Sequence, residues 1–468
     1  MPGQPITIRA QHDGKAIIDG EYERIPVKLG DTWPGPIGEY FVIEGIVARN
    51  SPDSVIYVRG DHNKFRRVSA YNANTDENSH VYTIWAKDTL LEDCVAAGTG
   101  RDLILIYQTE QNVIRRCFTA WTQWDGRNFC GVTWPNGNNV VIYNASNNLI
   151  ENSIAFGSAP GAGFLVQANA DQAVANNNRV LGSMAVLSGM NRDGTVRQWG
   201  STRPKPTTCD GMTDFNWPGK RVGFFTWGQG TLLNNTWRDI FASDNAGLGF
   251  SVDRPFVGGA RSGTLDRATI RSNGIDAPDS DGGAGSNIDQ DKIDFLTITN
   301  SKIEKTKYNG EGATIQNRYV NGTLTDTPLW PWPMESRIRN ELGINVTQTM
   351  AEIMAAPIGF RLATMPKFHQ LYNGQTGTVR VDVTSTGGFA EPVTVRATTS
   401  SPDVAITPAN VTVNPPGAAE FTLRNASASN GADFITVDFE GVSGNDTQSL
   451  SVTVLRNGSV INLLALSR

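Results

Sequence analysis

The 468-residue sequence is poor in charge, cysteine and histidine. Only 18% of its residues are charged and the formal net charge is −6, so nothing in the balance favours a nucleic acid or an anionic membrane as partner. The four histidines are scattered and the four cysteines include no CxxC pair, so the spacing typical of metal ligands is absent. No apolar run approaches the length of a membrane span. Glycine is abundant, with 48 residues, which suits a turn-rich all-β protein.

The first ten residues, MPGQPITIRA, lack the apolar stretch that a signal peptide needs. Two interpretations are open: a mature or trimmed secreted protein, or a cytoplasmic one. We expect the former, with an extracellular or cell-surface location.

A staggered repeat runs from about residue 40 to about residue 240. Its units are residues 40–48, 62–70, 88–96, 112–120, 148–156 and 178–186. Aligned, they share an apolar column (Ile43, Phe65, Leu91, Ile114, Ile150, Val180), a second column (Ile46, Val68, Cys94, Cys117, Ser153, Ser183) and a column of small residues (Ala48, Ala70, Ala96, Thr119, Ala155, Ala185). Successive units lie between 22 residues (Ile46 to Val68) and 36 residues (Cys117 to Ser153) apart. A repeat of this length that tolerates insertions predicts a solenoid.

The apolar spacing of two inside each unit, rich in Val, Ile and aromatics, predicts strands rather than helices. Between the two inward columns the spacing slips to three, which marks a tight corner, and Gly45, Asp93 and Asn152 are good turn residues there. A further strand precedes each unit after the first, at 54–58, 81–85, 103–107, 140–143 and 163–166. These features predict a right-handed parallel β-helix over residues 1–328.

The repeat, together with the opening PITIRAQHDGKAIIDG (5–20), resembles the pectate-lyase-like superfamily of right-handed β-helix proteins over roughly residues 5–325. Members often carry a leader and a further rung before this point, so the resemblance favours a mature or trimmed secreted chain. Many members are polysaccharide lyases or glycoside hydrolases, whereas others are structural, and the fold alone does not decide between them.

Two pairs of cysteines have different predicted roles. Cys94 and Cys117 share a column one turn apart, so we expect stacked, buried and inert thiols. Cys130 and Cys209 lie in two long loops that we place on the same side of the coil, where a disulfide is one alternative and two free thiols the other.

The outward position before each corner alternates in charge, reading Glu44, Arg66, Glu92, Arg115, Glu151. Stacked one turn apart, these residues would form a ladder of ion pairs, each contributing about 0.2–1 kcal/mol when exposed. A groove for an anionic polymer would be wholly basic, so the pattern favours a structural role.

An aromatic strip ends the strand before each unit, where the outward residue reads Arg59, Trp85, Tyr107, Tyr143 and Trp227. Such a strip predicts a platform on which sugar rings stack. Long loops lie beside it, and loop 121–139 adds Trp121, Trp124 and Trp134 for stacking. The alternative is that these aromatics pack the loops onto the coil.

Catalysis on a polysaccharide needs either a base with a cation, for a lyase, or two carboxylates, for a hydrolase. The candidates are Asp125, Asp210 and Asp214 as acids or bases, with Arg59 and Arg127 as neutralising cations. The strip carries none of the calcium-binding aspartates of the pectate lyases that the chain resembles, and neither a Gly-His-Gly nor the paired aspartates of polygalacturonases occur. Whether the protein is an enzyme therefore stays open.

Segment 276–294 is dense in aspartate, and Asp279, Asp281, Asp289 and Asp291 could supply oxygen ligands to Ca²⁺. The spacing does not match the helix–loop–helix calcium motif, so a solvated acidic loop is the alternative.

Beyond the coil the periodicity changes. Residues 329–343 predict a short helix, and 349–355, with Thr349 and Glu352 as a capping box, predict a second. We expect a helical cap and linker over 329–370 that covers the open end of the coil. Residues 371–468 alternate apolar and polar with frequent turn signals, which predicts a β-sandwich similar to the immunoglobulin-like modules of bacterial secreted proteins.

Three functions remain in consideration. The first is an extracellular carbohydrate-active protein that cleaves a polysaccharide, acidic or neutral, in a groove along the coil. The second is a surface or extracellular structural protein that self-associates without catalysis. The third is a non-catalytic glycan binder. We expect the first, with a polysaccharide as the partner and Ca²⁺ as the one cofactor the sequence suggests.

Overall fold

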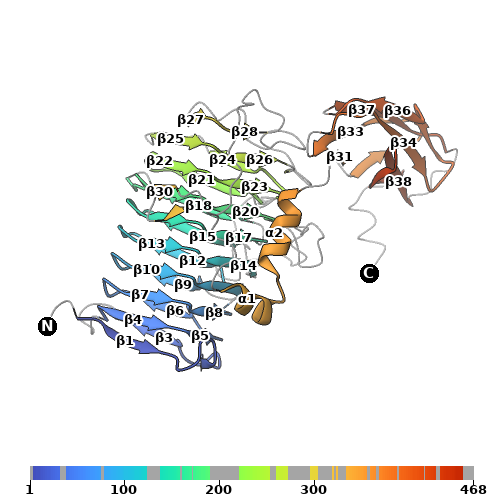
Figure 1. Ribbon diagram of the computed structural model, residues 1–468. Coiled ribbons are helices and arrows are strands. Elements are labelled where there is room, and N and C mark those ends of the chain that lie inside the picture. The colour runs from blue at the N-terminus through green and yellow to red at the C-terminus, as the bar shows by residue number, and fades with distance from the viewer. Residues whose placement is uncertain are drawn as a thin grey trace. The chain divides into compact units, whose positions relative to one another are not determined.

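The computed structural model (Figure 1) is all-β apart from two short helices, and it divides into two compact units, one of which is mainly Met354–Arg468. The residues described are 4–31, 38–74, 78–123, 137–158, 161–170, 172–189, 221–252, 260–271, 273, 296–303, 319–320, 323–324, 334–355, 359–364, 368–386, 389–415, 417–427 and 433–456. The first unit is a coil of stacked rungs, coloured blue to yellow-green in Figure 1, and it confirms the predicted parallel solenoid.

Each of the first eight rungs contributes one strand to each of three parallel sheets, and two further rungs contribute described strands to two of these sheets only. Sheet A contains β1 (Ile6–Arg9), β4 (Phe41–Glu44), β7 (Lys64–Arg66), β10 (Leu90–Glu92), β13 (Val113–Arg115), β16 (Leu149–Glu151), β19 (Arg179–Leu181), β22 (Leu232–Arg238), β25 (Arg261–Asp266) and β27 (Leu296–Thr299). Sheet B contains β2 (Ala16–Asp19), β5 (Ile46–Arg49), β8 (Ser69–Tyr71), β11 (Val95–Thr99), β14 (Phe118–Gln123), β17 (Ile154–Phe156), β20 (Met184–Val186), β23 (Phe241–Ser243), β26 (Thr269–Arg271) and β28 (Lys302–Ile303). Sheet C contains β3 (Val27–Leu29), β6 (Ile56–Val58), β9 (His80–Ile84), β12 (Asp102–Tyr107), β15 (Asn138–Tyr143), β18 (Phe164–Ala168), β21 (Phe224–Gly228) and β24 (Phe250–Val252). A small hairpin, β29 (Tyr319–Val320) with β30 (Thr323–Leu324), belongs to the same unit.

The predicted columns form the core of the coil. Phe65 of β7 pairs in register with Leu91 of β10, and Leu91 with Ile114 of β13, and all three side chains are fully buried. Each such side chain contributes about 1.5–3 kcal/mol by leaving water. Cys94 and Cys117 are buried free thiols on adjacent rungs, as expected, and burial raises the pKa of Cys117 well above its ordinary value.

On every described rung after the first, the corner between sheets A and B turns on one residue in the left-handed conformation, whereas residues 10–15 separate β1 from β2 on the first rung. The three predicted turn residues have positive φ, with 72° at Gly45, 52° at Asp93 and 49° at Asn152. The same corner continues through Gly182, Asp239, Arg267 and Asn300. One left-handed residue turns the chain while the side chains on both flanks keep pointing inward, which explains the slip from a spacing of two to three.

The charge ladder forms as predicted along sheet A. Arg66 lies 3.6 Å from Glu44 and 3.0 Å from Glu92, and Arg115 lies 2.9 Å from Glu92 and 3.6 Å from Glu151. Each pair joins neighbouring rungs, so the ladder stabilises the stacking of rungs.

A ladder of buried asparagines begins the strands of sheet A. The side-chain carbonyl of Asn148 accepts from the backbone and side-chain N–H groups of Asn112, and Asn178 and Asn235 continue the pattern. Asn63 occupies the same position three rungs before Asn148, and Thr89 interrupts the series. This column was visible two residues before the first apolar column, but sequence reasoning missed it.

Helix α1 (Glu335–Leu342) lies against the outer face of sheet B and does not close an end of the coil, so that expectation is wrong (Figure 1). Arg337 donates to the carbonyls of Ile46 and Arg67, at 2.8 and 2.6 Å. Glu341 accepts from Ser69 at 2.8 Å and from the hydroxyl of Tyr71. These polar contacts hold α1 against the side of the coil. Further along the coil the outer face of sheet B is apolar, since Phe118, Ile154, Met184 and Phe241 begin its strands and all are buried.

Helix α2 (Val346–Ala355) begins earlier than predicted. Asn345 accepts from the backbone N–H of Gln348 at 3.3 Å, and their side chains pair at 3.1 Å, so the cap is formed by these two residues. Thr349 lies inside the first turn, and the expected Thr349–Glu352 capping box is therefore wrong. The end of α2 is also near sheet B, since Arg271 of β26 donates to the carbonyl of Ile353.

The second unit is a β-sandwich of two sheets, as predicted. One sheet contains β31 (Gly359–Thr364), β33 (Thr376–Thr386), β37 (Gly417–Asn425) and β35 (Val404–Thr407). The other contains β32 (Phe368–Leu371), β39 (Asp446–Arg456), β38 (Asp433–Ser443), β34 (Val393–Thr399) and β36 (Asn410–Val413). The strands β31 and β32 come from the segment predicted as linker, and Phe360 and Leu371 pack in the sandwich core with Phe421 and Phe439.

Among the described residues, neither helix has the length and apolar character required to cross a membrane.

Candidate functional site

The predicted aromatic strip lies where the strands of sheet C end. Tyr107 of β12 and Tyr143 of β15 are in register, and each is the last residue of a strand whose inward residues are buried in the coil. Arg59 and Trp85 hold the equivalent places on the two preceding rungs. The structure therefore brings together four of the predicted substrate-binding residues.

The rings of this strip stack on one another. Arg59 Cζ lies 4.4 Å from the centroid of the Trp85 ring, Trp85 and Tyr107 are 4.3 Å apart, and Tyr107 and Tyr143 are 4.9 Å apart with planes 29° apart. These distances match the spacing of neighbouring strands, about 4.8 Å. Ring faces that contact each other cannot also contact a sugar, so the strip differs from the flat platform that we expected.

The inner side of the strip rests on an apolar cluster outside the coil. Tyr107, Tyr143 and Trp227 pack against this cluster, whose members are Leu105, Val141, Ala162, Leu165, Val222 and Phe225. Trp227 is separated from Tyr143 by Gln167, which occupies the rung between them. The strip is thus held firmly, and all five of its side chains remain half-buried.

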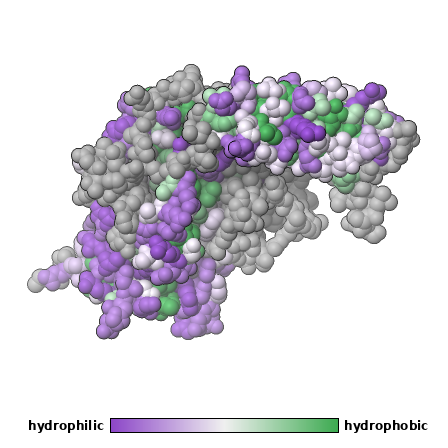
Figure 2. All heavy atoms as spheres, turned by 45° about the vertical axis from the view of Figure 1, so that its right-hand side comes forward, coloured by the Kyte–Doolittle hydropathy of each residue, from purple (hydrophilic) through white to green (hydrophobic). Residues whose placement is uncertain are grey.

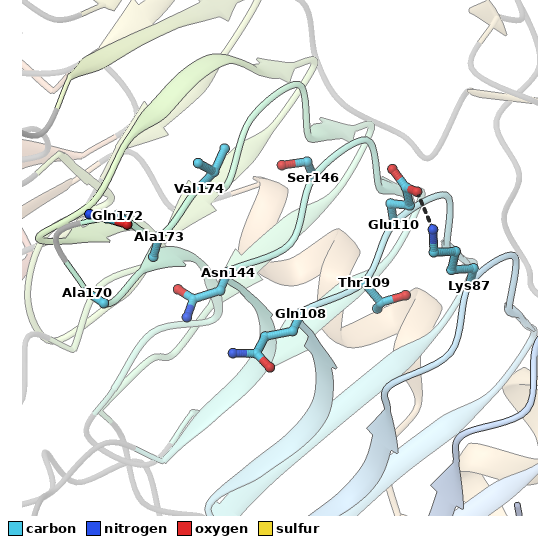
Figure 3. Close-up of a pocket in the computed structure, with 10 residues that line it drawn as sticks. All are labelled: Lys87, Gln108, Thr109, Glu110, Asn144, Ser146, Ala170, Gln172, Ala173 and Val174. Atoms are coloured by element: carbon cyan, nitrogen blue, oxygen red, sulfur yellow. Dashed lines mark hydrogen bonds and ion pairs between the residues drawn. The ribbon is translucent and has the colours of Figure 1, made fainter. Parts of the chain in front are cut away.

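An open groove of about 530 Å³ lies directly beyond the strip, at the corner that leads from sheet C to sheet A (Figure 3). It is lined by Lys87, Gln108, Thr109, Glu110, Asn144, Ser146, Ala170, Gln172, Ala173 and Val174, which come from four successive rungs. Gln108 follows Tyr107 and Asn144 follows Tyr143, and both have φ of 50°. The left-handed turn directs the chain away from sheet C just after each tyrosine.

The groove offers polar groups without a net charge. Asn144 accepts from the N–H of Asn169 at 2.7 Å, and Asn169 donates to the Tyr143 hydroxyl at 2.6 Å, which links groove and strip. Lys87 Nζ lies 2.7 Å from Glu110 Oε1 (Figure 3). This hydrogen bond raises the pKa of Lys87 and lowers the pKa of Glu110, so both are charged and paired at neutral pH.

A buried histidine–carboxylate pair lies at the opposite corner, between sheets B and C, where the long loops leave the coil. His80 Nδ1 is 3.1 Å from Asp102 Oδ2, and Asn138 donates to Asp102 at 2.8 Å. Burial alone would raise the pKa of Asp102, but the hydrogen bond and charge of His80 outweigh it and lower that pKa. The sequence reading regarded the four histidines as scattered and missed this pair.

The other predicted site residues are not part of the strip or lie outside the described residues. Trp121 belongs to β14 of sheet B, where its ring packs edge-on against Phe156 at 5.1 Å. Outside the described residues are Asp125, Arg127, Asp210, Asp214, Trp124 and Trp134, the proposed calcium ligands Asp279, Asp281, Asp289 and Asp291, and Cys130 and Cys209. Within the described ranges no cluster of three His, Cys, Asp or Glu residues could hold a metal ion.

Sequence reasoning also missed Gln108, Asn144 and Gln172 as groove residues. A signal was available, because an amide follows the strip tyrosine twice, in Tyr107–Gln108 and Tyr143–Asn144. These amides line the groove only because the chain makes a left-handed turn at them, and a glutamine does not predict that conformation.

Comparisons with known proteins give no family. No family model matches the chain, and no curated protein matches it. Solved structures that are similar include an MSP-domain protein-like family member from Caenorhabditis elegans (13% identity, TM-score 0.17, covering 20% of this chain and 99% of that one) and a human PapD-like domain (10% identity, TM-score 0.18, covering 21% and 85%). Domains 4 and 5 of an S-layer protein are also similar, with 18% identity, a TM-score of 0.15 and coverage of 21% and 51%. These low scores support no functional argument.

Proposed function

We propose that this chain is an extracellular carbohydrate-active protein of the pectate-lyase-like superfamily that binds a polysaccharide along the coil. The observation that carries the proposal is the groove beside the strip, which crosses four rungs and presents amides and hydroxyls next to ordered aromatic residues. Amides can both donate to and accept from sugar hydroxyls. An open groove suits a long polymer better than a small enclosed ligand.

Cleavage is the second part of the proposal, and we assign it to loops 121–139 and 187–221. These loops connect sheet B to sheet C, so they leave the coil where the sheet C strands begin and not, as the sequence led us to expect, beside the strip where those strands end. Asp125, Asp210 and Asp214 are the proposed acids or bases, with Arg127 as the neutralising cation. The chemistry, elimination or hydrolysis, follows from which of these groups meets the bound sugar.

The test is a screen of the full chain against uronate and neutral polysaccharides, with and without Ca²⁺. It measures the ultraviolet absorbance of unsaturated uronates, new reducing ends, and binding by calorimetry. Absorbance that is lost in Asp125→Ala would identify a lyase, and reducing ends without absorbance a hydrolase. Binding without either product would show that the protein binds a glycan without cleaving it. The proposal fails if every polysaccharide is neither bound nor cleaved.

One observation favours the alternative, a self-associating structural protein. Among the described strands, β1, β2 and β3 lie at the edges of their sheets, and Ile6 and Ile17 on this rung are 57% and 53% exposed. In Figure 2 a small hydrophobic area is visible at this lower end of the coil, among mainly hydrophilic residues. Oligomers that depend on concentration and disappear in Ile17→Lys, together with a silent polysaccharide screen, would support this alternative.

A further inference from the structure

We propose that the groove selects a neutral polysaccharide that runs along the coil axis, rather than a uronate polymer. This inference rests on the proposed function, because it names the substrate class of the same site. It follows from the charges, the free hydrogen-bonding groups and the repeat spacing of the groove.

The charges of the groove do not favour an anionic sugar. Lys87 is the one cation among the lining residues, and its ammonium is paired with Glu110 at 2.7 Å. Two more carboxylates lie close by: Asp61 accepts from the backbone N–H of Lys87 at 2.7 Å, and Asp88 follows Lys87 in the chain and pairs with His62. A uronate carboxylate entering here would meet no unpaired cation in the lining and would lie near several like charges.

The groove has free capacity for neutral hydroxyls. The side chains of Gln108 and Gln172 are exposed, and in the part of the chain that the structure describes neither makes a hydrogen bond. Asn144 uses its carbonyl oxygen to accept from Asn169, while its amide N–H₂ has no partner among the described residues. Each free amide N–H₂ supplies two donors, and each free carbonyl supplies an acceptor. Hydroxyl groups, which both donate and accept, complement such a set.

The spacing of these groups sets the direction of the ligand. Gln108 and Asn144 stand on neighbouring rungs at equivalent positions, since the backbone N–H of Gln108 donates to Tyr143 and that of Asn144 donates to Gln167. Lys87 lies on the rung before, and Ala170 to Val174 follow the strand of the rung after. Three steps of about 4.8 Å give a length of about 14 Å along the axis. A repeating chain of sugars fits such an array better than a single ring.

The experiment measures binding of the full chain to a neutral β-glucan and a mannan, and to polygalacturonate and alginate, by calorimetry at low salt. Gln108→Ala and Gln172→Ala should each weaken binding of the preferred neutral polymer about 3- to 10-fold through loss of one set of hydrogen bonds. Gln172 is exposed, so its variant will fold. Gln448→Ala, an exposed amide on the sandwich, is the matched control and should bind as the unaltered protein does. Glu110→Gln frees Lys87 and should raise uronate binding about 2- to 5-fold.

The outcomes separate the two claims. The inference is supported if neutral polymers bind and if the two glutamine variants weaken that binding. Uronates bound more tightly, with the same sensitivity to these variants, would overturn it and leave the proposed function standing. Neutral binding that is unaffected by both variants would place the ligand elsewhere and overturn it. Binding of no polysaccharide would overturn the proposed function itself.

Discussion

At the scale of single residues, the coil is held by side chains that repeat on every rung. The asparagine ladder satisfies backbone N–H groups that the left-handed and corner conformations would otherwise leave without a partner. Thr89 is the exception. Its backbone N–H donates to Asn112 at 2.9 Å, but its buried hydroxyl has no hydrogen-bond partner in the described part of the chain.

Replacing Thr89 by Asn should therefore stabilise the coil. An asparagine carbonyl at this position could accept from the N–H of Asn63 on the preceding rung, as the carbonyl of Asn112 accepts from the N–H of Thr89. We expect Thr89→Asn to raise the free energy of unfolding by about 1 kcal/mol, measured by urea denaturation. Thr89→Val, which only removes the unpaired hydroxyl, is the control. Equal stability of the two variants would show that the ladder does not extend to this rung.

At the scale of elements, α1 is attached to sheet B through two charged side chains. Arg337 is 8% exposed and donates to two backbone carbonyls of successive rungs. Glu341 accepts hydrogen bonds from the hydroxyls of Ser69 and Tyr71 and pairs with Arg337 at 2.8 Å. Burial, followed by the charge of Glu341, raises the pKa of Tyr71 well above its ordinary value, so its hydroxyl stays a donor.

Arg337→Ala should release α1 from the coil. Two buried carbonyls lose their donor and Glu341 loses its partner, a cost of about 3 kcal/mol. Hydrogen exchange followed by mass spectrometry should show faster exchange over residues 335–342 and unchanged exchange in β12. Arg339→Ala, on the same helix with a side chain 54% exposed, is the control and should exchange as the unaltered protein does. Unchanged protection of α1 in Arg337→Ala would contradict the role of this contact.

The elements also show what the sequence could and could not predict. The same inward columns recur on successive rungs, so Phe65, Leu91 and Ile114 each indicate the same inward position. The coil could therefore be predicted even if one of these residues had been misinterpreted. The place of α1 did not follow, because the pattern within a helix marks its apolar face but not the surface that receives it. The apolar outward residues of sheet B, such as Phe118 and Ile154, were the available clue. The groove was missed because it depends on how the chain turns after Tyr107.

At the scale of the whole molecule, the chain comprises two separate cores. The sandwich has its own cluster of buried residues, in which the rings of Phe421 and Phe439 lie 5.1 Å apart. The coil is stabilised chiefly between neighbouring rungs, whereas the sandwich pairs strands distant in the sequence. Stability in one unit therefore does not require the other.

We expect calorimetry of the full chain to show two unfolding transitions. Residues 354–468 expressed alone should fold and reproduce one of them, because the strands that pair in the sandwich are all included. Phe421→Ala should lower the temperature of that transition alone, because it lowers the free energy of unfolding of the sandwich by about 3–5 kcal/mol. A single transition, shifted as a whole by Phe421→Ala, would show that the two units unfold together.

The single-residue corner between sheets A and B has a consequence for how such a chain can change. A residue inserted there would shift the next strand by one place and turn its inward side chains outward. The length of this corner is therefore constrained on the described rungs after the first. The other two corners already differ in length from rung to rung. Insertions and exchanges at those corners leave the coil intact. After its first rung the coil thus combines one corner of constant length with two variable ones, an arrangement in which new ligand specificity can arise by loop replacement without refolding the scaffold.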